Sequence, residues 1–206
     1  MDRPLNHYLG CPACLGGTTA PCCPELMRII QEDRQSPERS NIAKAMLFLG
    51  VDLRGVSVLD LGPGMGLDLD AARSLGARET RYVENHCWLP PTKVLLGPPH
   101  VGILGDFYEP LVLRGVLPAD IVWSYSSITI YLWNTRKDWL DYLCTGASMV
   151  VLTPYWSHDK VGRLSSTLVP GKRMEDELTH AGFSRVWIEN IVVEPECPHT
   201  YVWRRK

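Results

Sequence analysis

The chain has 206 residues, of which 45% are hydrophobic and 21% charged, as expected for a globular domain with an ample core. The formal net charge is -2 and the pI about 6.3, so no overall positive field attracts nucleic acid or an anionic membrane surface. No segment reaches the roughly 18 uninterrupted apolar residues that suggest a membrane span, and the polar N-terminus lacks a signal-peptide core. We therefore expect a cytoplasmic protein.

Residues 1–50 are predicted to form an N-terminal arm. The first two dozen residues are rich in Gly, Pro, Thr and Cys and are expected to be irregular, followed by a helix over Pro24–Glu32. A second helix is predicted to begin with Ser36 as N-cap and Pro37 as first helical residue, and to stop at Gly50. This arm is expected to act as a lid over a ligand or to pack on the flank of the main domain.

Cysteines are unusually frequent in the arm. The chain has seven, and an odd number without an export signal argues against a disulfide framework. A Cys-x-x-Cys pair is a common half of a structural zinc site, but two adjacent cysteines rarely bind one tetrahedral ion. A zinc site, reduced buried thiols and a redox pair all stay open. The four clustered cysteines are Cys11, Cys14, Cys22 and Cys23, and other candidate ligands are His7, Cys197 and His199.

Residues 51–206 alternate short apolar runs with helical patterns, which predicts βαβ units, a mainly parallel sheet and helices on both of its faces. Residues 194–199 join the last two strands, and a link that short requires an antiparallel pair. The fold class is therefore α/β with a seven-stranded sheet. The predicted strands are Val56–Leu61, Thr80–Glu84, His100–Leu104, Asp120–Ser124, Ala147–Thr153, Phe183–Val193 and Thr200–Arg204, and the helices are Leu67–Leu75, Asn134–Leu143 and Lys172–Ala181.

A glycine-rich turn, Asp60-Leu-Gly62-Pro63-Gly64-Met-Gly66, follows the first of these strands and precedes a helix. Glycine permits positive φ and close approach of the backbone to a ligand, and the helix N-terminus offers N–H groups and a positive dipole end. The spacing differs from the Gly-x-Gly-x-x-Gly dinucleotide fingerprint and lacks the Lys and Ser/Thr of a phosphate loop. By itself it indicates a nucleotide-like or carboxylate-bearing ligand, or a tight turn without a ligand.

The turn resembles the first motif of the class I S-adenosylmethionine-dependent methyltransferases, whose fold is Rossmann-like with an antiparallel last strand. In that family an acidic residue ends the second strand and binds the ribose hydroxyls, as Glu84 would here, followed by Asn85. Asp106 and Phe107 match the family's adenine-binding pair after the third strand, and Ser124 ends the fourth strand near the methionine part. The resemblance covers residues 51–206, and by analogy Tyr8 of the arm would reach the cofactor.

The acceptor is expected to be a small molecule. Amino-directed nucleic-acid methyltransferases of this family carry an Asn/Asp-Pro-Pro-aromatic stretch after the fourth strand, where this chain has Ser124-Tyr125-Ser-Ser. Methyl transfer requires mainly an aligned acceptor, with a base only where the acceptor carries a proton. Tyr125, Tyr155 and His158 lie after the fourth and fifth strands and are the catalytic candidates, although a loop histidine is more often simply solvated.

Two alternatives use the same residues. An enzyme that transfers or cyclises the aminocarboxypropyl arm of S-adenosylmethionine would bind the cofactor through the same motifs. A non-catalytic partner protein would bind the cofactor or have lost it. The acceptor, the acceptor atom and the oligomeric state are not set by these motifs.

Overall fold

A computed structural model describes nine stretches of the chain. They are residues 40–63, 66–84, 99–104, 110–125, 144–153, 157–158, 164–165, 176–189 and 199–206. The helices predicted over Pro24–Glu32 and Asn134–Leu143 lie outside these residues, as does most of the N-terminal arm.

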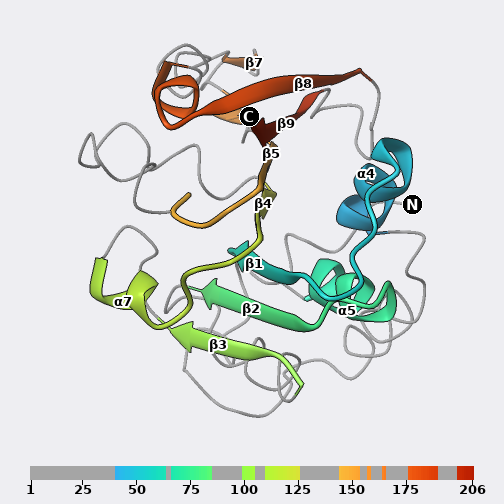
Figure 1. The fold of residues 1–206 in the computed structure, drawn as a ribbon, viewed down its shortest axis with the longest axis vertical. Coiled ribbons are helices and arrows are strands. Elements are labelled where there is room, and N and C mark those ends of the chain that lie inside the picture. Colours follow the sequence, from blue (N-terminus) through green and yellow to red (C-terminus); the bar gives the residue numbers. More distant parts are fainter. Residues whose placement is uncertain are drawn as a thin grey trace.

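The centre of the fold is a seven-stranded sheet in the order β3-β2-β1-β4-β5-β9-β8 (Figure 1). This confirms the predicted α/β class and strand number. Described helices follow β1 and β3 and precede β8, because parallel strands require crossovers that return over a face of the sheet. Their bounds are β1 Ser57–Leu61, β2 Glu79–Glu84, β3 Val101–Leu104, β4 Ile121–Tyr125, β5 Met149–Thr153, β8 Phe183–Glu189 and β9 His199–Arg205.

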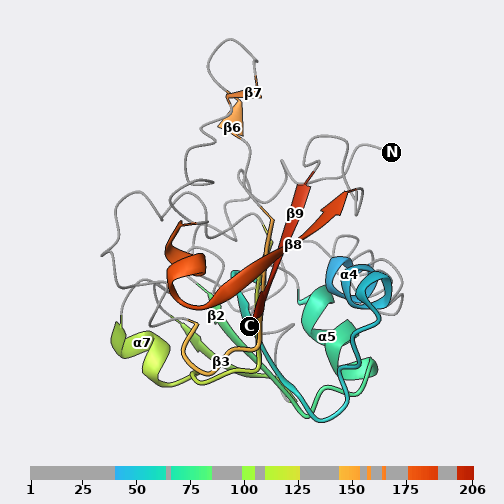
Figure 2. The same cartoon turned by 45° about the horizontal axis from the view of Figure 1, so that its top comes forward.

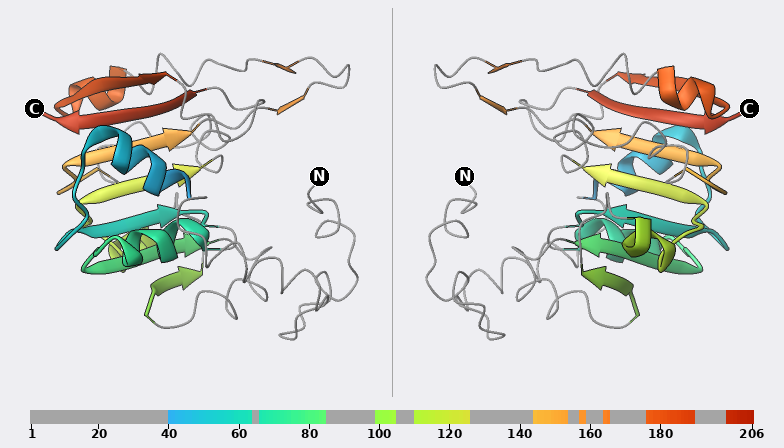
Figure 3. Two further views of the ribbon diagram at one scale, coloured as in Figure 1. Left: turned by 90° about the vertical axis from the view of Figure 1, so that its right-hand side faces the viewer. Right: turned by 90° about the vertical axis from the view of Figure 1, so that its left-hand side faces the viewer.

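Strands β1 to β5 are parallel, and β9 pairs antiparallel with both β5 and β8. The predicted antiparallel final pair is therefore confirmed. The arrowheads of the parallel strands lie at one edge of the sheet, while β9 points the other way (Figure 3). A short antiparallel ribbon of β6 (Ser157–His158) and β7 (Leu164–Ser165), which the sequence did not predict, lies beyond that edge.

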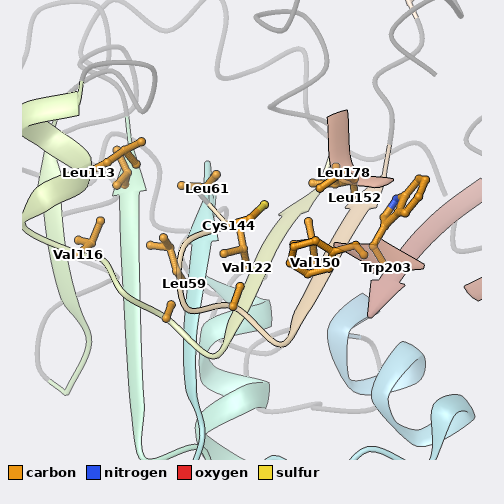
Figure 4. Packing of buried hydrophobic residues seen from close by; sticks show 14 residues of the cluster. Leu59, Leu61, Leu113, Val116, Val122, Cys144, Val150, Leu152, Leu178 and Trp203 are labelled. Atoms are coloured by element: carbon orange, nitrogen blue, oxygen red, sulfur yellow. The ribbon is translucent and has the colours of Figure 1, made fainter. Parts of the chain in front are cut away.

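Hydrophobic clusters cover both faces of the sheet. On one face, helices α4 (Asn41–Leu49) and α5 (Leu67–Ser74) pack against alternate strand residues such as Val58 and Trp123 (Figure 2). On the other face, α7 (Pro110–Arg114) and the helix over 176–180 pack against the intervening residues. Figure 4 shows this second cluster, which includes Leu59, Leu61, Leu113, Val150, Leu178 and Trp203. Buried apolar area on both faces is the main stabilising contribution, at roughly 25 cal/mol per Å².

Helix α4 begins four residues later than predicted. Its N-cap is Ser40, in extended backbone, and the hydroxyl of Ser40 accepts a hydrogen bond from the N–H of Ala43. Ser36 was the wrong choice because Ser40 also has a tertiary partner, the carboxylate of Asp68 in α5, at 2.6 Å. The predicted end is confirmed: Gly50 caps the helix in the left-handed region at φ 62°.

Candidate cofactor site

The glycine-rich turn leaves β1 and enters α5. Gly62 and Gly66 have φ values of 76° and 77°, which favour glycine because a Cβ is strained in this region. The N–H of Gly62 donates to the carbonyl of Val83 in β2 at 2.9 Å, and that of Gly66 donates to the carbonyl of Pro63 at 2.9 Å. The first hydrogen bond holds the start of the turn against β2, and the second joins the two ends of the turn. Gly64 lies outside the described residues.

This turn sits at a topological switch point of the sheet. From β1 the chain proceeds to β2 and β3 on one side and then crosses to β4 and β5 on the other. In open α/β sheets, ligands bind in the crevice outside the carboxyl ends of the strands at such a point. The sequence-predicted residues Asp60, Glu84, Ser124 and Tyr125 lie at or next to the carboxyl ends of β1, β2 and β4.

Asp60 is buried, with only 1% of its surface exposed. Neither carboxylate oxygen has a hydrogen-bond partner among the described residues, although buried polar groups are normally paired. Burial raises the pKa of Asp60 well above its usual range, and the nearby negative charges of Asp68 and Glu84 raise it further. An unpaired acid of this kind beside a glycine-rich turn is suited to receive a hydrogen-bond donor or a cation from a ligand.

Glu84 and Ser124 are both buried at strand ends that flank β1. Glu84 is 4% exposed and stands opposite Leu104 in the parallel register with β3. The Ser124 hydroxyl donates to the carbonyl of Leu61 at 3.2 Å, which holds the end of β4 against the last residue of β1. Burial raises the pKa of the Tyr82 phenol, and the charge of Glu84 adds to that effect. The structure therefore brings Asp60, Glu84 and Ser124 to one edge of the sheet.

Asp68, in the first turn of α5, was not singled out from the sequence. Its carboxylate accepts hydrogen bonds from the Ser40 hydroxyl at 2.6 Å, the Ile42 N–H at 3.3 Å and the Trp123 indole N–H at 3.1 Å. It thus joins α4, α5 and β4 beside the glycine-rich turn. The only sequence signal was an acidic residue at a helix start, which is too common to identify such a junction.

Several predicted site residues lie wholly or in part outside the described residues. Tyr125 ends β4 and His158 lies in β6, and for these two only the backbone is described. The described residues contain no group of three or more His, Cys, Asp or Glu side chains arranged to hold a metal ion. The predicted site residues that lie outside the described residues are Tyr8, Asn85, Asp106, Phe107, Tyr155 and the cysteines Cys11, Cys14, Cys22 and Cys23.

None of the helices in the described part of the chain combines the length and the apolar character needed to cross a bilayer.

No protein-family model and no curated protein sequence matches this chain. Solved structures do. The magnesium protoporphyrin IX methyltransferase ChlM from Synechocystis PCC 6803 with bound SAH is 14% identical, with a TM-score of 0.56 over 86% of this chain and 87% of ChlM. Streptomyces venezuelae DesVI is 17% identical, with a TM-score of 0.58 over 84% of this chain and 94% of DesVI. An S-adenosylmethionine-dependent methyltransferase from Mesorhizobium loti is 14% identical, with a TM-score of 0.55 over 82% of this chain and 100% of that protein.

These similarities and the strand order define the class of fold. It is the Rossmann-like α/β fold of the class I S-adenosylmethionine-dependent methyltransferases, which confirms at the level of fold the resemblance seen in the glycine-rich turn. Identities of this size show the fold alone, and this fold supports many activities, so function has to be argued from the site.

Proposed function

We propose that the chain is a methyltransferase that uses S-adenosylmethionine to methylate a small molecule. The observation that carries the proposal is Asp60, a buried acid without a partner among the described residues, at the switch point where this fold binds ligands. The donor bears an ammonium and a sulfonium, and either cation would satisfy this acid. A ligand that offers neither a cation nor a hydrogen-bond donor at this point would leave it unpaired.

Glu84 supports the same donor. Its position at the end of β2 suits a carboxylate that accepts hydrogen bonds from both hydroxyls of a ribose, and such charge-assisted bonds contribute about 1.5–3 kcal/mol each. Gly62 and Gly66 keep side chains away from the turn where the methionine part would lie. Asn85, Asp106, Phe107 and Tyr8 complete the proposed cofactor contacts. The chain's own part in the reaction is to align the sulfonium methyl with the acceptor atom and to exclude water.

The proposed acceptor is a small molecule because the net charge is slightly acidic and the nucleic-acid motif after β4 is missing. Tyr125, Tyr155 and His158 are the candidates to bind the acceptor or take up its proton. We also propose a cytoplasmic location, an arm over 1–50 that covers or flanks the site, and a cofactor domain over 51–206. A zinc ion on the four N-terminal cysteines would be structural, and metal analysis of the purified protein tests it.

The experiment that tests the function is product analysis. The protein is incubated with S-adenosylmethionine and fractionated small-molecule extracts, and the nucleoside products are separated by chromatography. Methyl transfer predicts S-adenosylhomocysteine, reduced at least tenfold in a Glu84→Gln variant. Methylthioadenosine as the main product would instead support aminocarboxypropyl transfer or cyclisation, and binding without any product would support a non-catalytic cofactor-binding protein.

A further inference from the structure

Helix α4 and the glycine-rich turn are joined through one carboxylate. Asp68 is the second residue of α5, and α5 begins directly after Gly66, the last glycine of the turn. The carboxylate of Asp68 accepts hydrogen bonds from the Ser40 hydroxyl at 2.6 Å and from the Ile42 N–H at 3.3 Å, at the start of α4. The two helices lie side by side on one face of the sheet (Figure 2). Their starts are therefore held together next to the turn.

The same carboxylate also reaches the sheet. It accepts a third hydrogen bond, at 3.1 Å, from the indole N–H of Trp123, which is 1% exposed and stands beside Asp60 in the parallel register of β4 with β1. Burial raises the pKa of Asp60, and the charge of Asp68 raises it further. Asp68 therefore fixes the start of α5 from two sides and acts electrostatically on the acid proposed to face the ligand.

Docking of α4 involves polar and apolar contacts that break together. The Ser40 hydroxyl is fully buried, and it accepts a hydrogen bond from the N–H of Ala43 while it donates to Asp68. Ile42 and Met46 of the same helix are buried in the core on this face of the sheet. Separation of α4 would remove both sets of contacts at once, so we treat its docking as one cooperative local equilibrium.

We propose that docking of α4 and binding of the cofactor are coupled through Asp68, which acts as a positioning residue: α4 holds Asp68, and Asp68 holds the start of α5 and the turn before it. The inference rests on the proposed function, because it takes S-adenosylmethionine or its product as the ligand. A movement of α5 would displace the free N–H groups that a helix offers at its start. The apparent affinity of a ligand falls with the fraction of molecules whose site is in the competent state.

The coupling has two measurable sides. Loss of the junction should weaken binding of the cofactor, because part of the binding free energy is then used to order the turn. Bound cofactor should in turn hold α4 in place by the same factor, since coupling between two sites is reciprocal. A hydrogen bond that only stabilises the fold would change neither quantity while the protein remains folded.

The first measurement is titration calorimetry of the full chain with S-adenosylhomocysteine. Ser40→Ala removes the hydroxyl, and so does Ser40→Gly, which keeps most of the N-cap preference and thus isolates the bond to Asp68. We expect both variants to bind at least about fivefold more weakly than wild type, the lower end of typical couplings between sites. Ser57→Ala is the matched control, because the Ser57 hydroxyl donates to the Asp120 carboxylate at 2.8 Å at the opposite edge of the sheet. It should bind as wild type does.

The second measurement is amide hydrogen exchange of the full chain with and without saturating S-adenosylhomocysteine. In the wild type, bound ligand should slow exchange in α4 by a factor similar to the loss of affinity in Ser40→Ala. In Ser40→Ala this slowing should be largely lost. The helix over 176–180 packs on the other face of the sheet and is the internal reference, whose exchange should not change.

Wild-type affinity in Ser40→Ala or in Ser40→Gly overturns the inference and leaves the proposed function standing. Exchange in α4 that bound S-adenosylhomocysteine does not slow, measured on the wild type alone, has the same consequence. Equal weakening by Ser57→Ala also overturns the inference, because affinity would then follow stability rather than this junction. If the folded wild type does not bind S-adenosylhomocysteine, both the proposed function and the inference fail.

Discussion

Replacing Asp68 by Ala should break the junction between α4, α5 and β4. The substitution removes the acceptor of three hydrogen bonds and leaves two side-chain donors unpaired, on Ser40 and Trp123, which are 0% and 1% exposed. A buried donor without a partner costs about 1–3 kcal/mol, and loss of an acid from a helix N-terminus adds about 0.3–1 kcal/mol.

Relief of the repulsion between Asp68 and Asp60 and entry of water at the half-buried site both reduce this cost. A net loss of about 2–3 kcal/mol remains. For a chain of this size each kcal/mol lowers Tm by about 2–4 °C, so we expect Tm to fall by about 5–10 °C.

The assay is thermal and urea unfolding of the wild type, Asp68→Ala, Trp123→Phe and the double variant. The coupling energy between the two sites should be about 1 kcal/mol or more, because one hydrogen bond is lost in either single variant. Asp52→Ala, the same truncation at an exposed ion pair with Arg54, is the control and should leave Tm unchanged. An Asp68→Ala variant as stable as this control, or strictly additive effects with Trp123→Phe, would refute the reasoning.

Three further predictions concern stability. The pKa of Asp60 is raised in the folded state, so its contribution to stability is greatest below the unfolded pKa and is lost as pH rises through the folded pKa. In urea unfolding, Asp60→Asn should therefore be more stable than wild type at pH 8, and the gain should shrink towards pH 4. A Cβ built on Gly102 overlaps the ring of Tyr82, so Gly102→Ala should lower Tm, and less so in a Tyr82→Leu background; equal losses in both backgrounds would argue against the overlap. The His100 side chain forms hydrogen bonds with Thr80 at 2.6 Å and with Asp70 at 2.8 Å. His100→Ala should therefore lower the free energy of unfolding in urea by about 1–3 kcal/mol. If His100→Ala costs as much in a Thr80→Val background as in the wild type, this reasoning is contradicted.

The sheet could be predicted from the sequence because its signals are local. Short apolar runs, separated by helical periods and glycine stops, place β1 to β5 within one or two residues of the observed bounds. The glycine-rich turn was equally readable, since Gly62 and Gly66 occupy backbone conformations that favour glycine. The antiparallel last pair followed from the short final connection and from the resemblance.

What the sequence did not show depends on tertiary contacts. Ser36 and Ser40 are both acceptable N-caps by residue type, and the carboxylate of Asp68, 28 positions away from Ser40, identifies the second. The buried contact between Thr80 and His100 spans 20 positions and carries no local pattern. The unpaired state of Asp60 was equally hidden, because burial and missing partners are properties of the fold.

Binding of S-adenosylhomocysteine, measured by titration calorimetry, tests the central claim most directly because it requires neither the acceptor nor turnover. We expect saturable binding with about one ligand per chain, weakened at least tenfold by Glu84→Ala. No detectable binding of S-adenosylhomocysteine or S-adenosylmethionine at millimolar concentration, with the protein folded, would contradict it.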